Sequence, residues 1–225
     1  MSHLLHIETA TTNCSVALSH NGNLIHCIEN NEADFRHSDH LHIYIKQLLD
    51  EANVKPFQLS SVAVSKGPGS FTGLRIGVST AKGLCYAHNL PLISVNSLEV
   101  LAAAYTPKIS DLLIPMFDAR RMEVFTMVLN AKKEVVSPTR TEIITSDSFK
   151  ELRDQGRLVL FGNGSDKCKG IIPEGNTYFI DSLKEPSAQH MVAKATDKFE
   201  AKNFEDIAYF EPFYLKDFYT NPPKP

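Results

Sequence analysis

The spacing of apolar residues predicts that the chain begins with strands. Short apolar runs predict strands at 4–9, 14–19 and 24–29. The Asn21-Gly22 pair between the second and third runs is typical of a tight hairpin turn. Apolar residues three and four positions apart then predict an amphipathic helix at 38–52. Three consecutive strands followed by a helix are therefore expected.

Along the rest of the chain, predicted strands alternate with predicted helices. This order predicts an α/β protein with two lobes. Further strands are expected at 62–65, 91–95, 112–118, 123–129, 139–145 and 158–161, and further helices at 73–88, 98–104, 146–154 and 187–201. The order of strands and helices recurs loosely on either side of Thr106-Pro107. We therefore expect an N-terminal lobe at 1–105, a smaller C-terminal lobe at 106–210 and an extended, proline-rich, mobile tail at 211–225.

Small residues mark one face of the helix predicted at 73–88. Gly73, Gly77 and Ala81 are four residues apart and so lie on one side of a helix. A glycine inside a helix costs about 1 kcal/mol relative to alanine. Some group is therefore expected to approach this backbone closely. A phosphate, a helix of another protein and the chain's own sheet are the alternatives.

The turn at 67–73 is the place where a phosphate would bind. It follows a strand and opens a helix, where backbone N–H groups gather. Its spacing fits neither the P-loop nor the dinucleotide motif, because Thr72 or Leu74 stands where glycine is required. Pro68 also removes one donor. The alternative is a tight turn in which Ser70 or Thr72 caps the helix.

Composition narrows the class of protein. The chain has 225 residues, 43% of them hydrophobic and 22% charged, with a net charge of −3. That balance argues against a protein that binds nucleic acid unaided. The first residues lack the features of a signal peptide, and no apolar run is long enough to span a membrane. Cysteines without a CxxC pair, at 14, 27, 85 and 168, indicate reduced thiols in a cytosolic protein.

Four motifs lie in order along most of the chain. They are Ile7-Glu-Thr-Ala-Thr-Thr-Asn-Cys-Ser-Val-Ala-Leu18, Lys66-Gly-Pro-Gly-Ser-Phe-Thr-Gly-Leu-Arg-Ile-Gly77, Phe117-Asp-Ala-Arg120 with Glu123-Val-Phe125, and Glu211-Pro-Phe-Tyr-Leu-Lys216. Together they resemble the TsaB family, also called YeaZ, of tRNA threonylcarbamoyladenosine biosynthesis proteins. The long Gly-Pro-Gly-Ser-Phe-Thr-Gly run is the most specific of them.

This resemblance implies a fold, a role and a set of partners. The fold is the two-lobe actin/hexokinase-like ATPase (ASKHA) fold, with mixed sheets flanked by helices. The role is that of a cytoplasmic, non-catalytic subunit that activates the catalytic protein TsaD, together with the ATPase TsaE. The complex transfers a threonylcarbamoyl group to the adenosine 3′ of the anticodon in tRNAs that read codons beginning with A. Contact with tRNA is expected only through the complex, and a homodimer is expected through the same surface.

The partner surface is predicted on two helices of the N-terminal lobe. A bundle built from the helices at 38–52 and 73–88 would bury Gly73, Leu74, Arg75, Gly77, Thr80, Ala81, Leu84, Tyr44 and Leu48. This agrees with the small-residue face described above. On this interpretation Gly77→Leu abolishes complex formation and leaves the fold largely intact.

An ATPase site is the second interpretation. Active ATPases of this fold carry aspartates and glycines at two hairpins, whereas here Glu8 and Asp118-Ala119-Arg120 stand there. Arg120 could hold an anion but not a metal. Weak nucleotide binding is expected at most, by Thr9, Thr11, Gly69, Gly162 and Gly164. No cofactor of its own is expected, beyond ATP or ADP at the complex interface. The alternative function is a small-molecule kinase or ATPase.

The sequence disfavours two further kinds of site, a metal site and a peptidase active site. The histidines at 37, 40 and 42 lie near Asp34 and Asp39, but a third ligand at a convincing distance is lacking, so a solvated helix start is expected in place of a metal site. Ser70 lies outside a Gly-x-Ser-x-Gly motif, which disfavours a peptidase.

Overall fold

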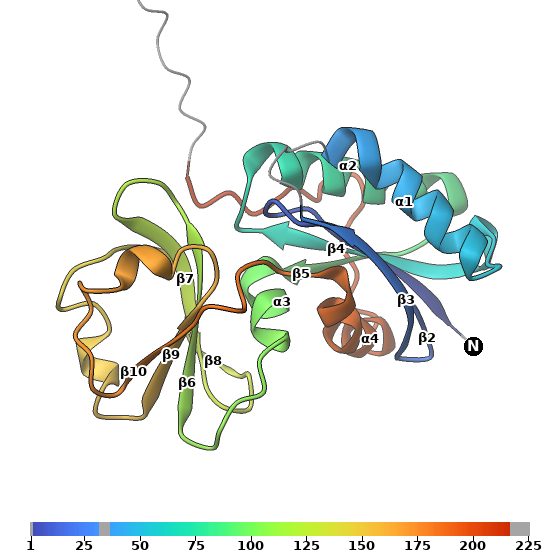
Figure 1. The fold of residues 1–225 in the computed structure, drawn as a ribbon. Coiled ribbons are helices and arrows are strands. Elements are labelled where there is room, and N and C mark those ends of the chain that lie inside the picture. The colour runs from blue at the N-terminus through green and yellow to red at the C-terminus, as the bar shows by residue number, and fades with distance from the viewer. Residues whose placement is uncertain (1, 32–36, 217–225) are drawn as a thin grey trace, which may run out of the picture.

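The computed structural model describes residues 2–31 and 37–216, and within them the chain forms two five-stranded sheets (Figure 1). The first sheet has the order β3-β2-β1-β4-β5. Its strands β1, β2 and β3 pair antiparallel, while β4 and β5 extend the sheet in parallel. The bounds are β1 His3–Glu8, β2 Cys14–His20, β3 Asn23–Asn30, β4 Leu59–Gly67 and β5 Leu92–Asn96.

The second sheet has the order β10-β9-β6-β7-β8 and repeats the mixed arrangement of the first. Strands β6, β9 and β10 are parallel, and β7 and β8 continue antiparallel. The bounds are β6 Asp111–Asp118, β7 Glu123–Leu129, β8 Val135–Ile143, β9 Arg157–Phe161 and β10 Thr177–Ile180.

Helices cover both faces of the first sheet because its inner strands are apolar on both sides. Helices α1 (His37–Glu51) and α2 (Phe71–His88) pack on one face, around residues such as Ile7 and Val64. Helix α4 (Val192–Glu200) packs on the other face, around Ile93. Helix α3 (Ser97–Ala103) lies between the two sheets. Such two-sided burial is typical of parallel strands.

Three predicted features differ from the observed ones. The helix expected at 146–154 is only a 3-10 turn at Lys150–Leu152, after Phe149 in a left-handed backbone conformation with φ +58°. Strand β10 was not predicted. The second lobe was expected to run to 210, yet the 3-10 helix Ala188–Met191 and α4 return to the first sheet. Burial of Met191 and Ala195 against that sheet accounts for the return.

The C-terminal segment is fastened to both sheets rather than free along 211–216. The amide of Phe213 donates to the Lys66 carbonyl at 2.7 Å. The Tyr214 ring lies 4.5 Å from that of Phe71. Lys216 Nζ donates to the Ala119 carbonyl at 3.1 Å. The rest of the predicted tail, 217–225, lies outside the described residues. Within the described residues no helix is long and apolar enough to cross a membrane.

Candidate partner-binding face and nucleotide site

The turn before α2 caps the N-terminus of that helix. Ser70 Oγ accepts a hydrogen bond from the Gly73 amide at 3.3 Å, and the Ser70 amide donates to the Ala10 carbonyl at 2.6 Å. A Cβ at Gly69 would lie under 3.0 Å from that same carbonyl. Glycine is therefore required here for close approach to the protein's own turn. Capping by Ser70, the alternative to phosphate binding, is confirmed.

The stripe of Gly73, Gly77 and Ala81 faces the chain's own sheet. Thr9 Oγ1 donates to the Gly73 carbonyl at 2.8 Å. A Cβ at Gly77 would lie under 3.0 Å from that same Oγ1, closer than real Cβ atoms come. Ala81 is fully buried in the core beneath α2. Of the three alternatives, the chain's own sheet is the group that approaches this backbone.

This packing corrects part of the predicted partner surface. Leu74 and Leu48 are also buried within the chain, so these five residues present no surface to a partner: Gly73, Leu74, Gly77, Ala81 and Leu48. Spacing alone identified a close-packed helix face but not its side. Arg75 is exposed, Tyr44 and Leu84 are half-buried, and Thr80 lines a surface hollow, so their partner role stays a prediction.

The opposite side of α2 is the exposed one, and we call it the outer face of α2, defined by Arg75, Ile76, Ser79, Gly83 and Tyr86. Tyr86 is 85% exposed, and a Cβ at Gly83 would meet nothing within 4 Å. Ile43 on the neighbouring helix α1 is 59% exposed. These exposed apolar side chains, with the small exposed residues Ser79 and Gly83, make the two helices a candidate surface for binding another protein.

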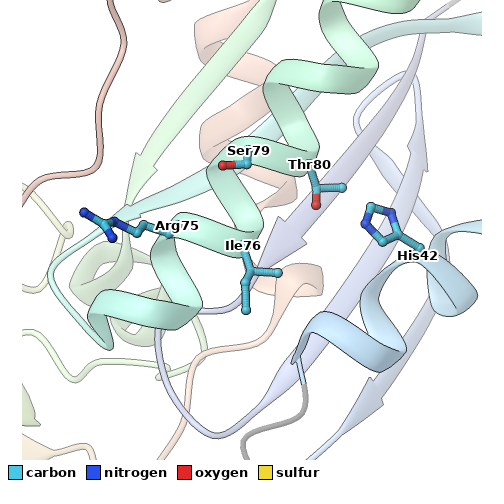
Figure 2. Close-up of a pocket in the computed structure, with 5 residues that line it drawn as sticks. All are labelled: His42, Arg75, Ile76, Ser79 and Thr80. Atoms are coloured by element: carbon cyan, nitrogen blue, oxygen red, sulfur yellow. The ribbon is translucent and has the colours of Figure 1, made fainter.

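An open hollow of about 330 Å³ lies between α1 and the outer face of α2 (Figure 2). Its lining is His42 from α1 with Arg75, Ile76, Ser79 and Thr80 from α2. The Arg75 guanidinium lies 4.1 Å from the centre of the Phe71 ring, which in turn contacts Tyr214. The C-terminal segment thus supports the start of this face.

The second predicted site, at the two hairpins where a nucleotide would bind, begins at the end of β1 with Glu8. This carboxyl group is fully buried, and its Oε1 accepts hydrogen bonds from the Ala10 amide and from Ser65 Oγ, both at 2.7 Å. Burial raises the pKa of Glu8 to about 7. The group therefore sits near the midpoint of its titration at neutral pH.

The loop expected to cup an adenosine uses its own backbone donors internally. The amides of Gly162, Asn163 and Gly164 donate to the carbonyls of Leu183, Lys184 and Met116. Side-chain atoms at Gly162 or Gly164 would collide with the backbone of β6. Thr9 is engaged by α2, as described above. These glycines serve close packing between strands, and nucleotide binding by Thr9, Thr11, Gly69, Gly162 and Gly164 stays a prediction.

Side chains from distant segments join beside the second hairpin. Asn163 Oδ1 accepts from the Asp118 amide at 2.8 Å, and its Nδ2 donates to both oxygens of Glu185 at 3.2 Å. Burial raises the pKa of Glu185, while hydrogen bonds from Thr11, Asn163 and Thr12 act in the opposite direction. Glu185 carried no sequence signal, because only the fold brings residue 185 to residue 163. Glu8 did carry one, since it ends an otherwise apolar strand.

The metal interpretation falls mostly on residues that are not described. Asp34 lies outside the described residues, and so do the side chains of His37 and Asp39. Within the described part of the chain, there is no group of three or more potential ligands. Ser70, which the peptidase interpretation would need as a nucleophile, has its hydroxyl engaged as a helix cap.

Sequence comparisons place these features among known proteins. A family model described as TsaD, tRNA N6-adenosine threonylcarbamoyltransferase, matches residues 28–220. A protein from Haemophilus influenzae, named tRNA threonylcarbamoyladenosine biosynthesis protein TsaB, is 34% identical over 95% of this chain and 93% of its own length. The protein of that name from Bacillus subtilis is 35% identical over 76% of each chain.

Structure comparison gives the same picture of the fold. A crystal structure from Pseudomonas aeruginosa, titled as an uncharacterized protein with similarity to peptidase YEAZ, superposes with a TM-score of 0.84 at 25% identity over 96% of this chain and 100% of that one. YeaZ from the same organism gives a TM-score of 0.80 at 24% identity, with the same coverage. With two mixed sheets flanked by helices, the predicted actin/hexokinase-like fold class is confirmed.

Proposed function

The chain belongs to the TsaB family of tRNA threonylcarbamoyladenosine biosynthesis proteins, and from that premise we propose that it is a non-catalytic subunit that activates the enzyme of this modification. It takes part in tRNA threonylcarbamoyladenosine biosynthesis. The partner that we propose is a catalytic subunit of the TsaD kind, assisted by the ATPase TsaE. A homodimer through the same surface forms when that partner is absent.

The outer face of α2 is the observation that carries this proposal. Ser79 and Gly83 are small, exposed and four residues apart, so a partner helix can approach the backbone there. Tyr86 on α2 and Ile43 on α1 supply exposed apolar surface. Tyr is among the residues that most often dominate the binding energy of protein interfaces. A two-helix surface of this kind fits a helix bundle shared with another protein.

The contacts around the second hairpin support the non-catalytic part of the proposal. Asp118 is paired with Lys167 Nζ, and Arg120 stands two residues later. The amides at 162–164 donate to carbonyls of the chain, as described above. We propose that the protein has no nucleotide cofactor of its own and that ATP or ADP acts at the complex interface. Purified alone, it should hydrolyse ATP far more slowly than the about 1 s⁻¹ of an ordinary enzyme.

A reconstituted reaction tests the proposal. Threonylcarbamoyl incorporation into tRNA would be measured with the purified catalytic subunit and ATPase, with and without this protein. Incorporation is expected only when this protein is present, and none when it is alone. Equal incorporation without it would overturn the proposed role. The small-molecule kinase or ATPase alternative would then be tested with a screen of phosphate acceptors.

Ser79→Trp is expected to weaken binding of the catalytic subunit about tenfold or more, because the indole would hold the two helices apart. The free energy of unfolding should change by only about 0.5 kcal/mol, since Ser79 is exposed. Isothermal titration calorimetry would measure the affinity and urea unfolding the stability. Ala193→Trp, at an exposed position of α4 on the other side of the sheet, is the matched control. Equal affinities of the two variants would exclude the outer face of α2 as the binding surface.

A further inference from the structure

We propose that the hairpin between β6 and β7 binds the sugar-phosphate backbone of RNA through Arg120 and Arg121. This inference rests on the proposed function, which supplies an RNA substrate. The inference goes beyond the proposed function because it gives this chain its own contact with the RNA substrate. The resemblance to the family implied contact with tRNA only through the complex.

The backbone of this hairpin favours other residues than arginine. Arg120 and Arg121 both have positive φ, +67° and +50°. Asn and Gly adopt this left-handed conformation far more readily than long side chains do. The hairpin between β2 and β3 uses such a pair, Asn21-Gly22, with φ of +47° and +79°. Two arginines at the β6–β7 tip therefore require a reason other than the turn itself.

Contacts within the chain do not supply that reason. Both arginines are exposed, and within the described residues neither guanidinium has an ion pair or a hydrogen bond. Each of the four other arginines in the described residues does have a partner: Arg75 the Phe71 ring, Arg140 the Glu142 carboxylate, Arg153 two backbone carbonyls and Arg157 the Asp111 carboxylate. Among the arginines of residues 2–31 and 37–216, these two guanidinium groups are therefore the ones left to bind something outside the chain.

Two lysines hold the backbone of the β6–β7 tip, from which the two arginine side chains extend. Lys167 Nζ donates to the Arg121 carbonyl at 2.8 Å and to the Glu123 carbonyl at 3.0 Å, and it pairs with Asp118. Lys216 Nζ, from the C-terminal segment, donates to the Ala119 carbonyl and pairs with Glu123. The arginines and lysines outnumber the two carboxylates, and leave a local excess of positive charge on a chain of net charge −3. Rigid support is what a binding group needs.

Shape and position favour RNA over a free nucleotide. A small molecule needs a concave site that buries most of its surface, whereas protruding guanidinium groups are well suited to a phosphate backbone, which they contact with paired hydrogen bonds. The tip also lies near the partner face, because Lys216 at the tip and Tyr214 against Phe71 belong to one short segment. RNA held by a catalytic subunit on α2 would lie within reach.

The test removes both charges while improving the turn. In the variant Arg120→Asn with Arg121→Gly, the affinity of the complex with the catalytic subunit is measured by fluorescence anisotropy across a salt series. The ligand is a tRNA transcript with adenosine 3′ of the anticodon. Affinity is expected to fall about tenfold at about 0.1 M salt, and the slope of log affinity against log salt to decrease by about 1.5. The melting temperature should hold or rise, because the left-handed strain is relieved.

The matched control is Lys132→Asn with Lys133→Gly, at the tip of the hairpin on the other end of β7. It removes the same charge and also replaces a residue with positive φ, Lys133 at +62°. The control should keep the affinity and the salt slope of the wild type. An unchanged slope in the arginine variant would overturn the proposal. So would a loss of binding to the catalytic subunit itself, which would identify an acidic protein surface as the ligand. Failure of the wild-type protein to support modification would instead disprove the proposed function.

Discussion

Gly77→Leu is expected to destabilise the protein by roughly 4 kcal/mol or more, a large part of the 5–15 kcal/mol typical of a folded domain. Even the first carbon of the new side chain would collide with Thr9 Oγ1. Relief would require α2 to move from the sheet, which breaks the hydrogen bond from Thr9 to the Gly73 carbonyl and opens the core beneath Ala81. Urea unfolding followed by circular dichroism would measure the loss.

Gly83→Leu is the matched control, because it makes the same change on the same helix six residues later. A Cβ at Gly83 meets nothing within 4 Å, so the new side chain enters solvent. The variant should be more stable than the wild type by about 0.5–1 kcal/mol, since leucine favours helix over glycine. A stable, folded Gly77→Leu protein would show that α2 can leave the sheet at little cost, and would restore the interpretation of Gly77 as an interface residue.

The contrast between these two glycines shows what spacing can and cannot predict. Residues four apart share a helix face, and this much was read correctly for Gly73, Gly77 and Ala81. Which group lies against that face depends on Thr9, some 64 residues away in the chain from Gly73. Helical periodicity carries no information about such a contact. The exposed glycine, Gly83, lies off this stripe, and its spacing gives no sign that it is exposed.

Strands were predicted best where an apolar run is long and bounded by turn residues. The Asn21-Gly22 hairpin is an example, and both residues have the positive φ that the pair favours. Strand β10 was missed because its four residues, Thr177–Ile180, are too few to show a period. The segment at 146–154 has helical spacing, but the left-handed Phe149 interrupts the backbone there. A local backbone reversal at a non-glycine residue has no reliable sequence signal.

The argument about the two hairpins rests on residues that they lack. Missing aspartates and glycines are visible in the sequence, and they argue against an ordinary ATPase site. Internal use of the amides at 162–164 is not visible, because the accepting carbonyls come from β6 and from the segment around Leu183. The bridge from Asp118 through Asn163 to Glu185 is hidden for the same reason.

The charge state of Glu8 should make the stability of this protein depend on pH. Its pKa is about 7 in the folded protein against an ordinary value of 4.5. The folded state therefore holds the proton more tightly than the unfolded state. Stability from this group is fully present below pH 4.5, is lost as pH rises through 7 and is constant above that. A separation of this size corresponds to about 3 kcal/mol.

His6 acts in the opposite sense on the same strand. Burial lowers its pKa to about 3, so the folded state disfavours its charged form. His6 therefore costs stability as pH falls below about 6.5, its usual pKa. Within pH 4.5–6.5 the two groups oppose one another, and the wild-type profile alone would hide both. A variant of one group is needed to separate them.

Glu8→Gln isolates the carboxyl group, because glutamine keeps an oxygen to accept from Ala10 and Ser65 but never ionises. At pH 8 the variant should be more stable than the wild type by about 2–3 kcal/mol, and the difference should approach zero at pH 4.5. Urea unfolding at several pH values measures it, with the exposed Glu174→Gln as the control that should show no such change. A difference that is the same at pH 5 and pH 8 would mean that Glu8 is ionised in the folded protein throughout. Since Glu8 fixes Ala10, and Ala10 fixes the Ser70 cap of α2, the ionised form would then be part of what holds the proposed partner face in place.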